Sequence, residues 1–249
     1  MEEKIFLKEN ERIDDLEFKN LKIIQNKKNF CFGIDSVLIS NFCAQNKMAG
    51  NAVDIGSGTG IISILIATKA KINHIYAIEI QNEIAEMSKR SIKLNHLENK
   101  IEVLNINLKN SVEYITPNSI DCVVTNPPYM KNGSGAKNDE PGKIIARHEV
   151  KATLSDILDV SYKLLKDRGE FYMVHRMDRL VDVLSECRTK RLEPKVIQFI
   201  HPYVNNSPNL FMIKAIKNGG KQLKVLDPLV IYNDNGEYTD EILKIYGKK

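Results

Sequence analysis

Closely spaced cysteines are absent from this chain of 249 residues. Its four cysteines stand far apart and none forms a Cys-x-x-Cys sequence, which argues against a zinc knuckle and against a redox pair. The five histidines are dispersed as well, so we expect no metal site. Cys122 lies inside an apolar run and is interpreted as a small core residue.

Long apolar runs are also absent. The longest, around residues 61–67, is far too short to span a bilayer, and the acidic, lysine-bearing N-terminus has no apolar signal region. We therefore expect a soluble cytoplasmic protein with no membrane partner. The hydrophobic content of 43% and the lack of repeats suit one α/β domain.

A glycine-rich turn is the first positive signal. The apolar run 51–55 predicts a buried strand, Gly56-Ser57-Gly58-Thr59-Gly60 a tight turn, and 61–69 a helix. Glycines permit positive φ and let the backbone approach a ligand closely. A second predicted strand, 74–80, places Glu79 near its C-terminal end, where a carboxylate can accept hydrogen bonds from both hydroxyls of a ribose.

The spacing of these glycines separates several ligand classes. A P-loop is rejected because no lysine follows Gly60, and a dinucleotide turn is a poor match because its third glycine comes one residue later. Gly-x-Gly-x-Gly with Asp54 two residues upstream resembles motif I of the Rossmann-like S-adenosylmethionine methyltransferases. In that family the loop passes the methionine part of the cofactor, and the acid after the second strand binds ribose. A glycine-rich connector without a ligand is the alternative.

The apolar run 120–125 ends in Asn126-Pro127-Pro128-Tyr129. Each proline fixes its φ angle and lacks an N–H, so the local backbone offers carbonyl acceptors. The Asn126 side chain adds an acceptor, and Tyr129 adds a planar face and a hydroxyl. This combination suits a flat group that bears an amine, such as a nucleobase. A strand-terminating turn is the simpler alternative.

The order of the predicted elements indicates an α/β fold with a Rossmann-like, doubly wound sheet. Helices and strands alternate, and the last strand pair has no helix between its members, which favours an antiparallel last strand, as in the seven-stranded methyltransferase sheet. If the strands around Val53 and Val124 are neighbours where the strand order reverses, the glycine turn and Asn126 lie side by side. The further predicted elements are helices 83–95, 154–165 and 179–190 and strands 101–105, 169–174, 196–200 and 210–216.

We interpret residues 1–249 as a single methyltransferase domain. Residues 1–50 form an N-terminal hairpin and helix extension, 51–217 the catalytic core and 218–249 a C-terminal appendage. The extension is predicted to pair strands 21–25 and 30–32, followed by a helix, 36–44, that Asp35 caps. Asp234-Asn235-Gly236 predicts a hairpin turn in the appendage.

Basic residues are unevenly spread. Residues 131–221 carry 17 lysines and arginines against 11 aspartates and glutamates, whereas the rest of the chain carries 19 against 21. A phosphate backbone attracts such an excess, although a solvated surface accounts for it equally. The polar stretch 131–138 is either a substrate lid or an idle loop.

The motifs together resemble those of the amino-methyltransferases: Asp54 to Gly60, Glu79 and Asn126 to Tyr129. Two further segments, 32–38 and 145–149, are similar to the bacterial valine-tRNA adenine-N6 methyltransferase family, and the resemblance runs from about Leu21 to the C-terminus. It implies that S-adenosylmethionine is the cofactor, that tRNA is the partner, and that the adenine beside the anticodon is methylated on N6.

The resemblance also implies a set of site residues. The catalytic ones are Asn126, Pro127 and Tyr129. Those that bind the cofactor are Asp54, Gly56, Gly58, Gly60, Glu79, Asn107 and Asn126. Those that contact the substrate are Pro128, Lys131, Arg147 and His148, although the last two could simply start a surface helix. Asn107 departs from the pattern, since many relatives have an aspartate there to accept a bond from the cofactor adenine.

The expected mechanism starts with the target base outside its stack, on Tyr129. The Asn126 side chain and the Pro127 carbonyl accept the two amine hydrogens, and the nitrogen then attacks the sulfonium methyl.

Guanine N2 of ribosomal RNA, or a protein glutamine, is an alternative target. The fold would also suit a non-catalytic RNA-binding module or, with less support from the glycine spacing, a nicotinamide-dependent dehydrogenase. The sequence leaves the oligomeric state open.

Overall fold

A computed structural model describes residues 7–27, 33–128 and 152–249. The strands are β1 (Glu11–Asp15), β2 (Lys22–Asn26), β3 (Ala49–Ile55), β4 (Lys71–Ile78), β5 (Ile101–Leu104), β6 (Ile120–Thr125), β7 (Leu165–Arg176), β8 (Leu192–His201), β9 (Leu210–Lys217), β10 (Lys224–Val225) and β11 (Leu229–Val230). The helices are α1 (Ile34–Gln45), α2 (Ile61–Lys69), α3 (Asn82–Leu94), α5 (Leu154–Leu164), α6 (Leu180–Thr189), α7 (Asp240–Ile245) and the short 3₁₀ turns η2 (Leu108–Glu113) and η3 (Met177–Arg179).

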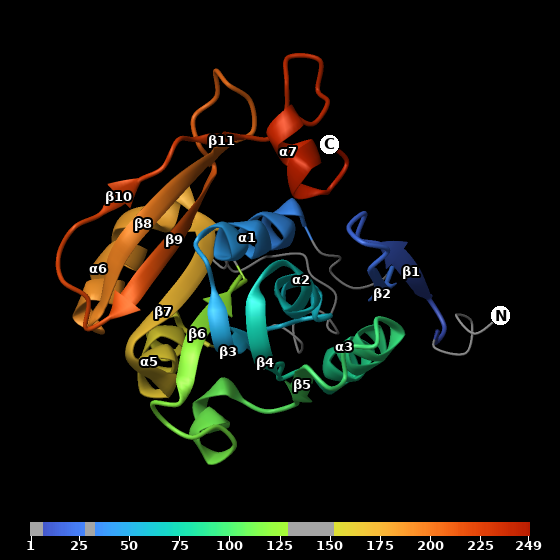
Figure 1. Ribbon diagram of the computed structural model, residues 1–249, viewed down its shortest axis with the longest axis horizontal. Helices are drawn as coiled ribbons and strands as arrows, with labels where there is room; N and C mark the ends of the chain where they lie inside the picture. The colour runs from blue at the N-terminus through green and yellow to red at the C-terminus, as the bar shows by residue number, and fades with distance from the viewer. Residues whose placement is uncertain (1–6, 28–32, 129–151) are drawn as a thin grey trace, which may run out of the picture.

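The main sheet has nine strands in the order β10-β8-β9-β7-β6-β3-β4-β5, with β11 also paired to β8 (Figure 1). Strands β3 to β7 run parallel to one another, and β9 is antiparallel to both β7 and β8. The predicted doubly wound sheet and its antiparallel last strand are therefore confirmed. From β3 the chain builds β4 and β5 on one side and then returns to place β6 on the other side, so the strand order reverses between β3 and β6.

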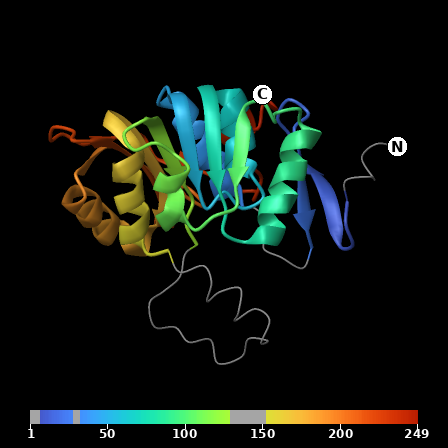
Figure 2. The ribbon, with the colours of Figure 1, turned by 90° about the horizontal axis from the view of Figure 1, so that it is seen from below.

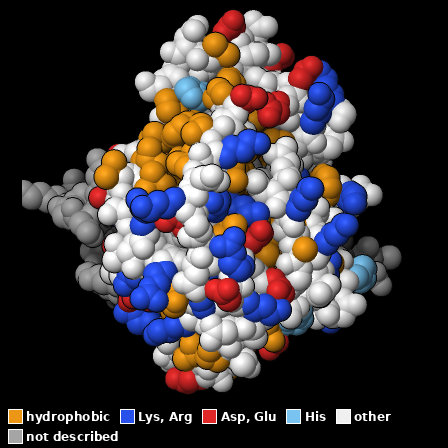
Figure 3. All heavy atoms as spheres, turned by 60° about the vertical axis from the view of Figure 1, so that its left-hand side comes forward, with side chains coloured by type: hydrophobic (Ala, Val, Ile, Leu, Met, Phe, Trp, Pro, Cys, Tyr) orange, Lys and Arg blue, Asp and Glu red, His pale blue; other side chains and the backbone are white. Residues whose placement is uncertain are grey.

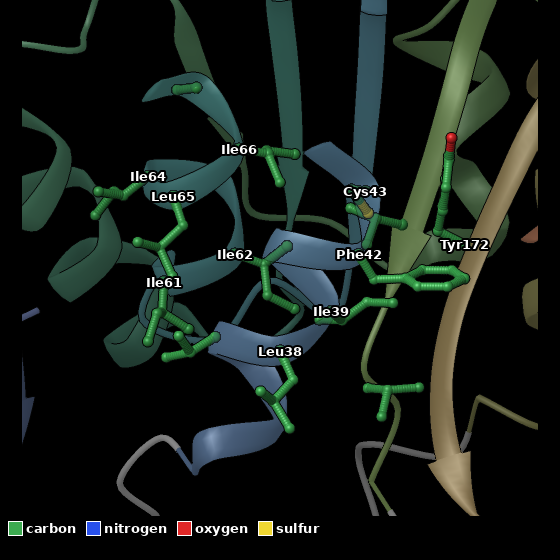
Figure 4. Close-up of a cluster of buried hydrophobic side chains, with 14 of the residues drawn as sticks. Leu38, Ile39, Phe42, Cys43, Ile61, Ile62, Ile64, Leu65, Ile66 and Tyr172 are labelled. Carbon is green, nitrogen blue, oxygen red and sulfur yellow. The ribbon is translucent and has the colours of Figure 1, made fainter. Parts of the chain in front are cut away.

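Helices cover both faces of the sheet (Figures 1 and 2). Helices α1, α2, α3 and α7 contribute to the core on one face, and α5 and α6 to the core on the other. The carboxyl-terminal halves of the central strands β3 and β6 are buried and mostly apolar, because helices cover both faces of a parallel sheet. Helix α2 is apolar on almost every side because it packs both on the sheet and against the neighbouring helix α1 (Figure 4).

The N-terminal extension differs from its prediction in two respects. Strand β2 pairs with β1 in a separate two-stranded sheet, whereas the predicted partner 30–32 lies outside the described residues. Helix α1 begins at Ile34 with Gly33 at the N-cap, so Asp35 is not the cap as predicted. Its Oδ1 accepts a hydrogen bond from the Ser36 backbone N–H at 3.0 Å, and the carboxylate lies in the first turn, where it is favoured by the helix dipole.

The C-terminal residues extend the sheet. The predicted turn around Gly236 is confirmed, because Tyr232 and Tyr238 bridge across it and Gly236 has φ +79°. Strands β10 and β11, which the sequence did not indicate, pair in parallel with the outer edge of β8. Between them the backbone carbonyl of Asp227 accepts a bond of 3.1 Å from Gln198 of β8.

We expect Phe42→Ala to destabilise the protein by about 3–5 kcal/mol, because the ring is fully buried and its removal leaves a cavity beside Tyr172. The two rings meet edge to face, with centroids 6.2 Å apart (Figure 4). Urea unfolding measures the change. Val181→Ala is the control, because that side chain is 78% exposed and its truncation should change stability by less than about 0.5 kcal/mol. Equal effects of the two substitutions would contradict the packing assigned to Phe42.

Candidate active site

The glycine turn begins where β3 ends and is tied to the neighbouring strand. The backbone N–H groups of Gly56 and Ser57 both donate to the carbonyl of Ile78, at 2.9 and 3.0 Å. This fixes the turn at the carboxyl edge of the sheet, next to the end of β4. Ligands of open α/β sheets bind at this edge, where the strand order reverses.

The three glycines of the turn serve two purposes. All have positive φ, +70° at Gly56, +55° at Gly58 and +88° at Gly60. A Cβ atom added to Gly56 or Gly58 would meet none of the described atoms within 4 Å, so the described part of the chain leaves room beside the turn there. A Cβ atom at Gly60 would instead lie 2.5 Å from Ser88 Oγ of α3. Gly56 and Gly58 therefore leave room for a ligand, whereas Gly60 lets two helices approach.

Glu79 directly follows β4 and is held against the turn. Its side chain is buried, Oε2 accepts a bond of 3.0 Å from Gly58 N–H, and Oε1 accepts one of 2.8 Å from Gln81 N–H. Burial raises the pKa of this carboxyl, and the backbone hydrogen bonds oppose that shift. Because each carboxylate oxygen has a second lone pair, Glu79 can still accept bonds from two ligand hydroxyls.

Asp54 lies under the turn and is fully buried. Its Oδ2 accepts a bond of 2.7 Å from Ser63 Oγ, and none of the described groups donates to Oδ1. Burial raises the pKa of Asp54 to about 7, while the bond from Ser63 opposes the shift and the negative charge of Glu79 adds to it. Because neither acid has a basic partner among the described residues, this region is favourable for a cationic ligand.

Asn126 emerges at the end of β6, beside the glycine turn. The register of β3 and β6 pairs Ile55 with Thr125, and Thr125 Oγ1 donates to the Ile55 carbonyl at 2.9 Å. The predicted adjacency of the two motifs is therefore confirmed. The Asn126 side chain is partly buried, and its Nδ2 donates to Ser36 Oγ of α1 at 3.3 Å.

The remaining predicted residues are placed as follows. Pro127 is buried and Pro128 is exposed, while Tyr129, Lys131, Arg147 and His148 lie outside the described residues. Asn107 is the N-cap of η2: its side-chain oxygen accepts a bond of 3.0 Å from Lys109 N–H. One lone pair of that oxygen remains for a ligand.

Sequence reasoning missed Asn105, which follows β5. Its Nδ2 donates to the Glu79 carbonyl at 2.8 Å and to the Ile80 carbonyl at 3.1 Å, so it braces the loop that carries the acid. An amide at the end of the predicted strand 101–105, at the same edge of the sheet as Glu79, was the available signal.

Six of the twelve lysines and arginines that are described in 131–221 form ion pairs with acids. For example, Arg176 Nη2 lies 3.3 Å from Asp178 Oδ2, and Arg179 Nε lies 2.7 Å from Asp182 Oδ2. On the face that carries α6 and β10, lysines and arginines alternate with acids (Figure 3). Within the described ranges, no three acids, histidines or cysteines are grouped to hold a metal ion, and no helix is both long and apolar enough to cross a membrane.

Comparison with known families identifies the family to which this chain belongs. The profile of the methyltransferase small domain family matches residues 33–187, more than half of the sequence. The chain belongs to this family. The match begins at the N-cap of α1 and extends through most of α6, so it includes the glycine turn, Glu79 and Asn126. The resemblance to methyltransferases found in the sequence is thereby confirmed.

Curated relatives are similar over most of their length. The tRNA1(Val) (adenine(37)-N6)-methyltransferase of Pedobacter heparinus is 26% identical over 223 residues, which cover 90% of this chain and 92% of the relative. The protein of the same name from Haemophilus influenzae strain PittEE is 25% identical over 230 residues, covering 92% and 94%.

Solved structures share the fold at lower identity. A predicted O-methyltransferase from Agrobacterium tumefaciens aligns with a TM-score of 0.68 at 19% identity, covering 86% of this chain and 96% of that one. TYW2 of M. jannaschii, solved in complex with AdoMet, aligns with a TM-score of 0.55 at 15% identity, covering 84% and 86%. These likenesses support the Rossmann-like methyltransferase fold.

Asp54→Asn should remove a pH dependence of stability. The pKa of about 7 in the folded state lies above the ordinary value of 3.8, so the folded protein keeps a proton that the unfolded chain releases. The free energy of unfolding should therefore fall as the pH rises from about 4 to about 7, by roughly 1.4 kcal/mol per pH unit, and level off above. Urea unfolding of both proteins across this range measures the difference. Parallel pH profiles for wild type and variant would contradict a raised pKa.

Proposed function

We propose that this protein transfers the methyl group of S-adenosylmethionine to N6 of an adenine in tRNA, beside the anticodon of a valine tRNA. The observation that carries the proposal is the placement of Asn126 next to the glycine turn, across the β3–β6 pair. The names of relatives that align with nine-tenths of the chain support the choice of substrate.

The residues present fit S-adenosylmethionine. Gly56 and Gly58 leave open space at the carboxyl edge, and the buried acids Asp54 and Glu79 suit a ligand that carries positive charge and a ribose. Glu79 would hold the ribose hydroxyls, and Asn107 would accept a bond from the adenine amine through its remaining lone pair. The cofactor supplies an electrophilic methyl group on its sulfonium.

Asn126 and Pro127 would then hold the substrate amine. The target adenine has to leave its stack before its amine can be reached, and Tyr129, which lies outside the described residues, would stack on it for roughly 1–3 kcal/mol. The Asn126 Oδ1 and the Pro127 carbonyl each accept one amine hydrogen. These bonds increase the lone-pair density on nitrogen and aim it at the methyl carbon. The proton is lost to solvent after attack, because the nitrogen is then cationic.

Positioning and preorganised dipoles account for the catalysis in this scheme. A buried strand end is suited to that task, because the β6 backbone is fixed by the sheet up to Thr125 and the next residue is the acceptor. Pro127 has no N–H of its own, so no backbone donor at that position competes with the substrate amine.

The substrate is tested directly with labelled cofactor. We expect the wild-type protein to methylate unmodified total tRNA, and mass spectrometry of the digested RNA to find N6-methyladenosine. N2-methylguanosine, or label in protein only, would contradict the proposed target. Absence of both cofactor binding and label would favour a non-catalytic module.

Asn126→Ala should lower turnover by roughly 10²–10³-fold, because it removes one of the two acceptors for the amine. Cofactor affinity, measured by calorimetry, should change little. Asn99→Ala is the matched control: that asparagine is exposed and precedes β5 at the opposite edge of the sheet, so its turnover should stay normal. Near-normal turnover of Asn126→Ala would refute the assignment.

Glu79→Gln should weaken cofactor binding by roughly 10–100-fold, because a charged acceptor is replaced by a neutral amide that has only one acceptor oxygen. Calorimetric titration with S-adenosylmethionine measures the change. Glu98→Gln, on an exposed residue before β5, serves as the control and should bind normally. Unchanged affinity in Glu79→Gln would show that this acid does not hold the cofactor.

A further inference from the structure

The N-terminal helix contacts the proposed catalytic amide. Ser36, in the first turn of α1, is 6% exposed, and its Oγ accepts a bond of 3.3 Å from Asn126 Nδ2. The two residues are 90 positions apart in the sequence and belong to different elements. This contact therefore depends on how α1 packs against the end of β6.

The first turn of α1 holds Ser36 in a fixed place. The Ser36 backbone N–H donates to Asp35 Oδ1 at 3.0 Å and to the Gly33 carbonyl at 3.3 Å. One turn later, Ser40 Oγ donates to the Ser36 carbonyl at 2.7 Å. The following residues, Val37 and Leu38, are buried in the core. The hydroxyl of Ser36 is thus presented from a packed helix.

The orientation of the Asn126 amide decides whether it can act. Only its carbonyl oxygen accepts hydrogen bonds, whereas its nitrogen carries two donors. If the amide were rotated by half a turn, its donors would face the donors of the substrate amine. Because Ser36 Oγ on α1 accepts a bond from Asn126 Nδ2, it favours the amide orientation in which Oδ1 points away from the helix.

We propose that Ser36 is a positioning residue, which orients the Asn126 amide so that its oxygen receives the substrate amine. The inference rests on the proposed function, because it assigns Asn126 the role of amine acceptor. It adds a residue from outside the glycine turn and the Asn-Pro-Pro-Tyr segment. It also gives α1 a part in the chemistry, in addition to its part in the core.

The test compares rates of methyl transfer in a single turnover with saturating S-adenosylmethionine and tRNA. Ser36→Ala should lower this rate roughly three- to tenfold, as expected for one neutral hydrogen bond. Cofactor affinity, tRNA affinity and the midpoint of thermal unfolding should stay close to those of the wild type. Ser36→Thr keeps the hydroxyl and should restore the rate.

Ser161→Ala is the matched control. It removes a buried hydroxyl that bonds within its own helix, α5, which packs on the other face of the sheet from α1. Its rate should equal that of the wild type. In an Asn126→Ala background, Ser36→Ala should have no further effect on the residual rate, because the group that it orients is gone.

Three outcomes would overturn the proposal: an unchanged rate in Ser36→Ala, an equal loss in Ser161→Ala, or an undiminished effect in the Asn126→Ala background. If Ser36→Ala unfolds, Ser36→Cys takes its place, because it fills the site but accepts hydrogen bonds weakly. The activity of the wild-type protein distinguishes failure of this proposal from failure of the proposed function. A wild type that methylates no RNA refutes the function, whereas an active wild type with an equally active Ser36→Ala refutes only the role of Ser36.

Discussion

The parallel pairing of β3 with β6 brings together two segments that are 70 residues apart in the sequence. Both strands are buried on both faces, so their register is fixed by the core as well as by the backbone ladder. The side-chain bond from Thr125 to the Ile55 carbonyl joins them at their last residues. The glycine turn and Asn126 follow immediately, and their relative position is therefore a property of the sheet.

Burial of the two acids of the site lowers the stability of the folded protein. Asp54 and Glu79 are both buried and both have raised pKa values, and the charge of Glu79 adds to the shift at Asp54. None of the hydrogen bonds described for these carboxylates comes from a basic side chain. Such an arrangement is unfavourable in an empty protein and favourable around a cation, which accords with the positive charge of S-adenosylmethionine. Local instability of this kind is common where a site serves a ligand.

Much of the fold could be predicted from the sequence because its signals are local. The apolar runs and the glycine turn located β3, α2 and β6 closely, and the absence of a helix between 200 and 210 gave the antiparallel strand. Strand β1 was missed because its sequence, Glu-Arg-Ile-Asp-Asp, has only one apolar residue and its pairing depends on β2. Two-residue strands such as β10 carry too few residues for any periodic signal.

The residues of the site likewise divide into those with a local sequence signal and those without one. That Asp54, Gly56, Gly58, Glu79 and Asn126 lie near one another could be predicted because their spacing is a motif, whereas the contacts of Asn105 and Ser36 join elements that are distant in the sequence. Asp35 was predicted as a cap because it is a good capping residue, but the helix starts two residues earlier than expected, at Ile34. The roles of all the predicted site residues remain predictions, and Tyr129, Lys131, Arg147 and His148 also lie outside the described residues.

The outer side of β8 shows how the C-terminal residues matter beyond the site. An unpaired strand offers its free N–H and C=O groups to any other extended chain, which is a common start of aggregation. Here β10 and β11 occupy that border in two short pieces, and Pro228 between them provides no donor. The interrupted pairing satisfies β8 without creating another long, regular border. The C-terminal strands therefore cover the border at which β8 could otherwise pair with another extended chain.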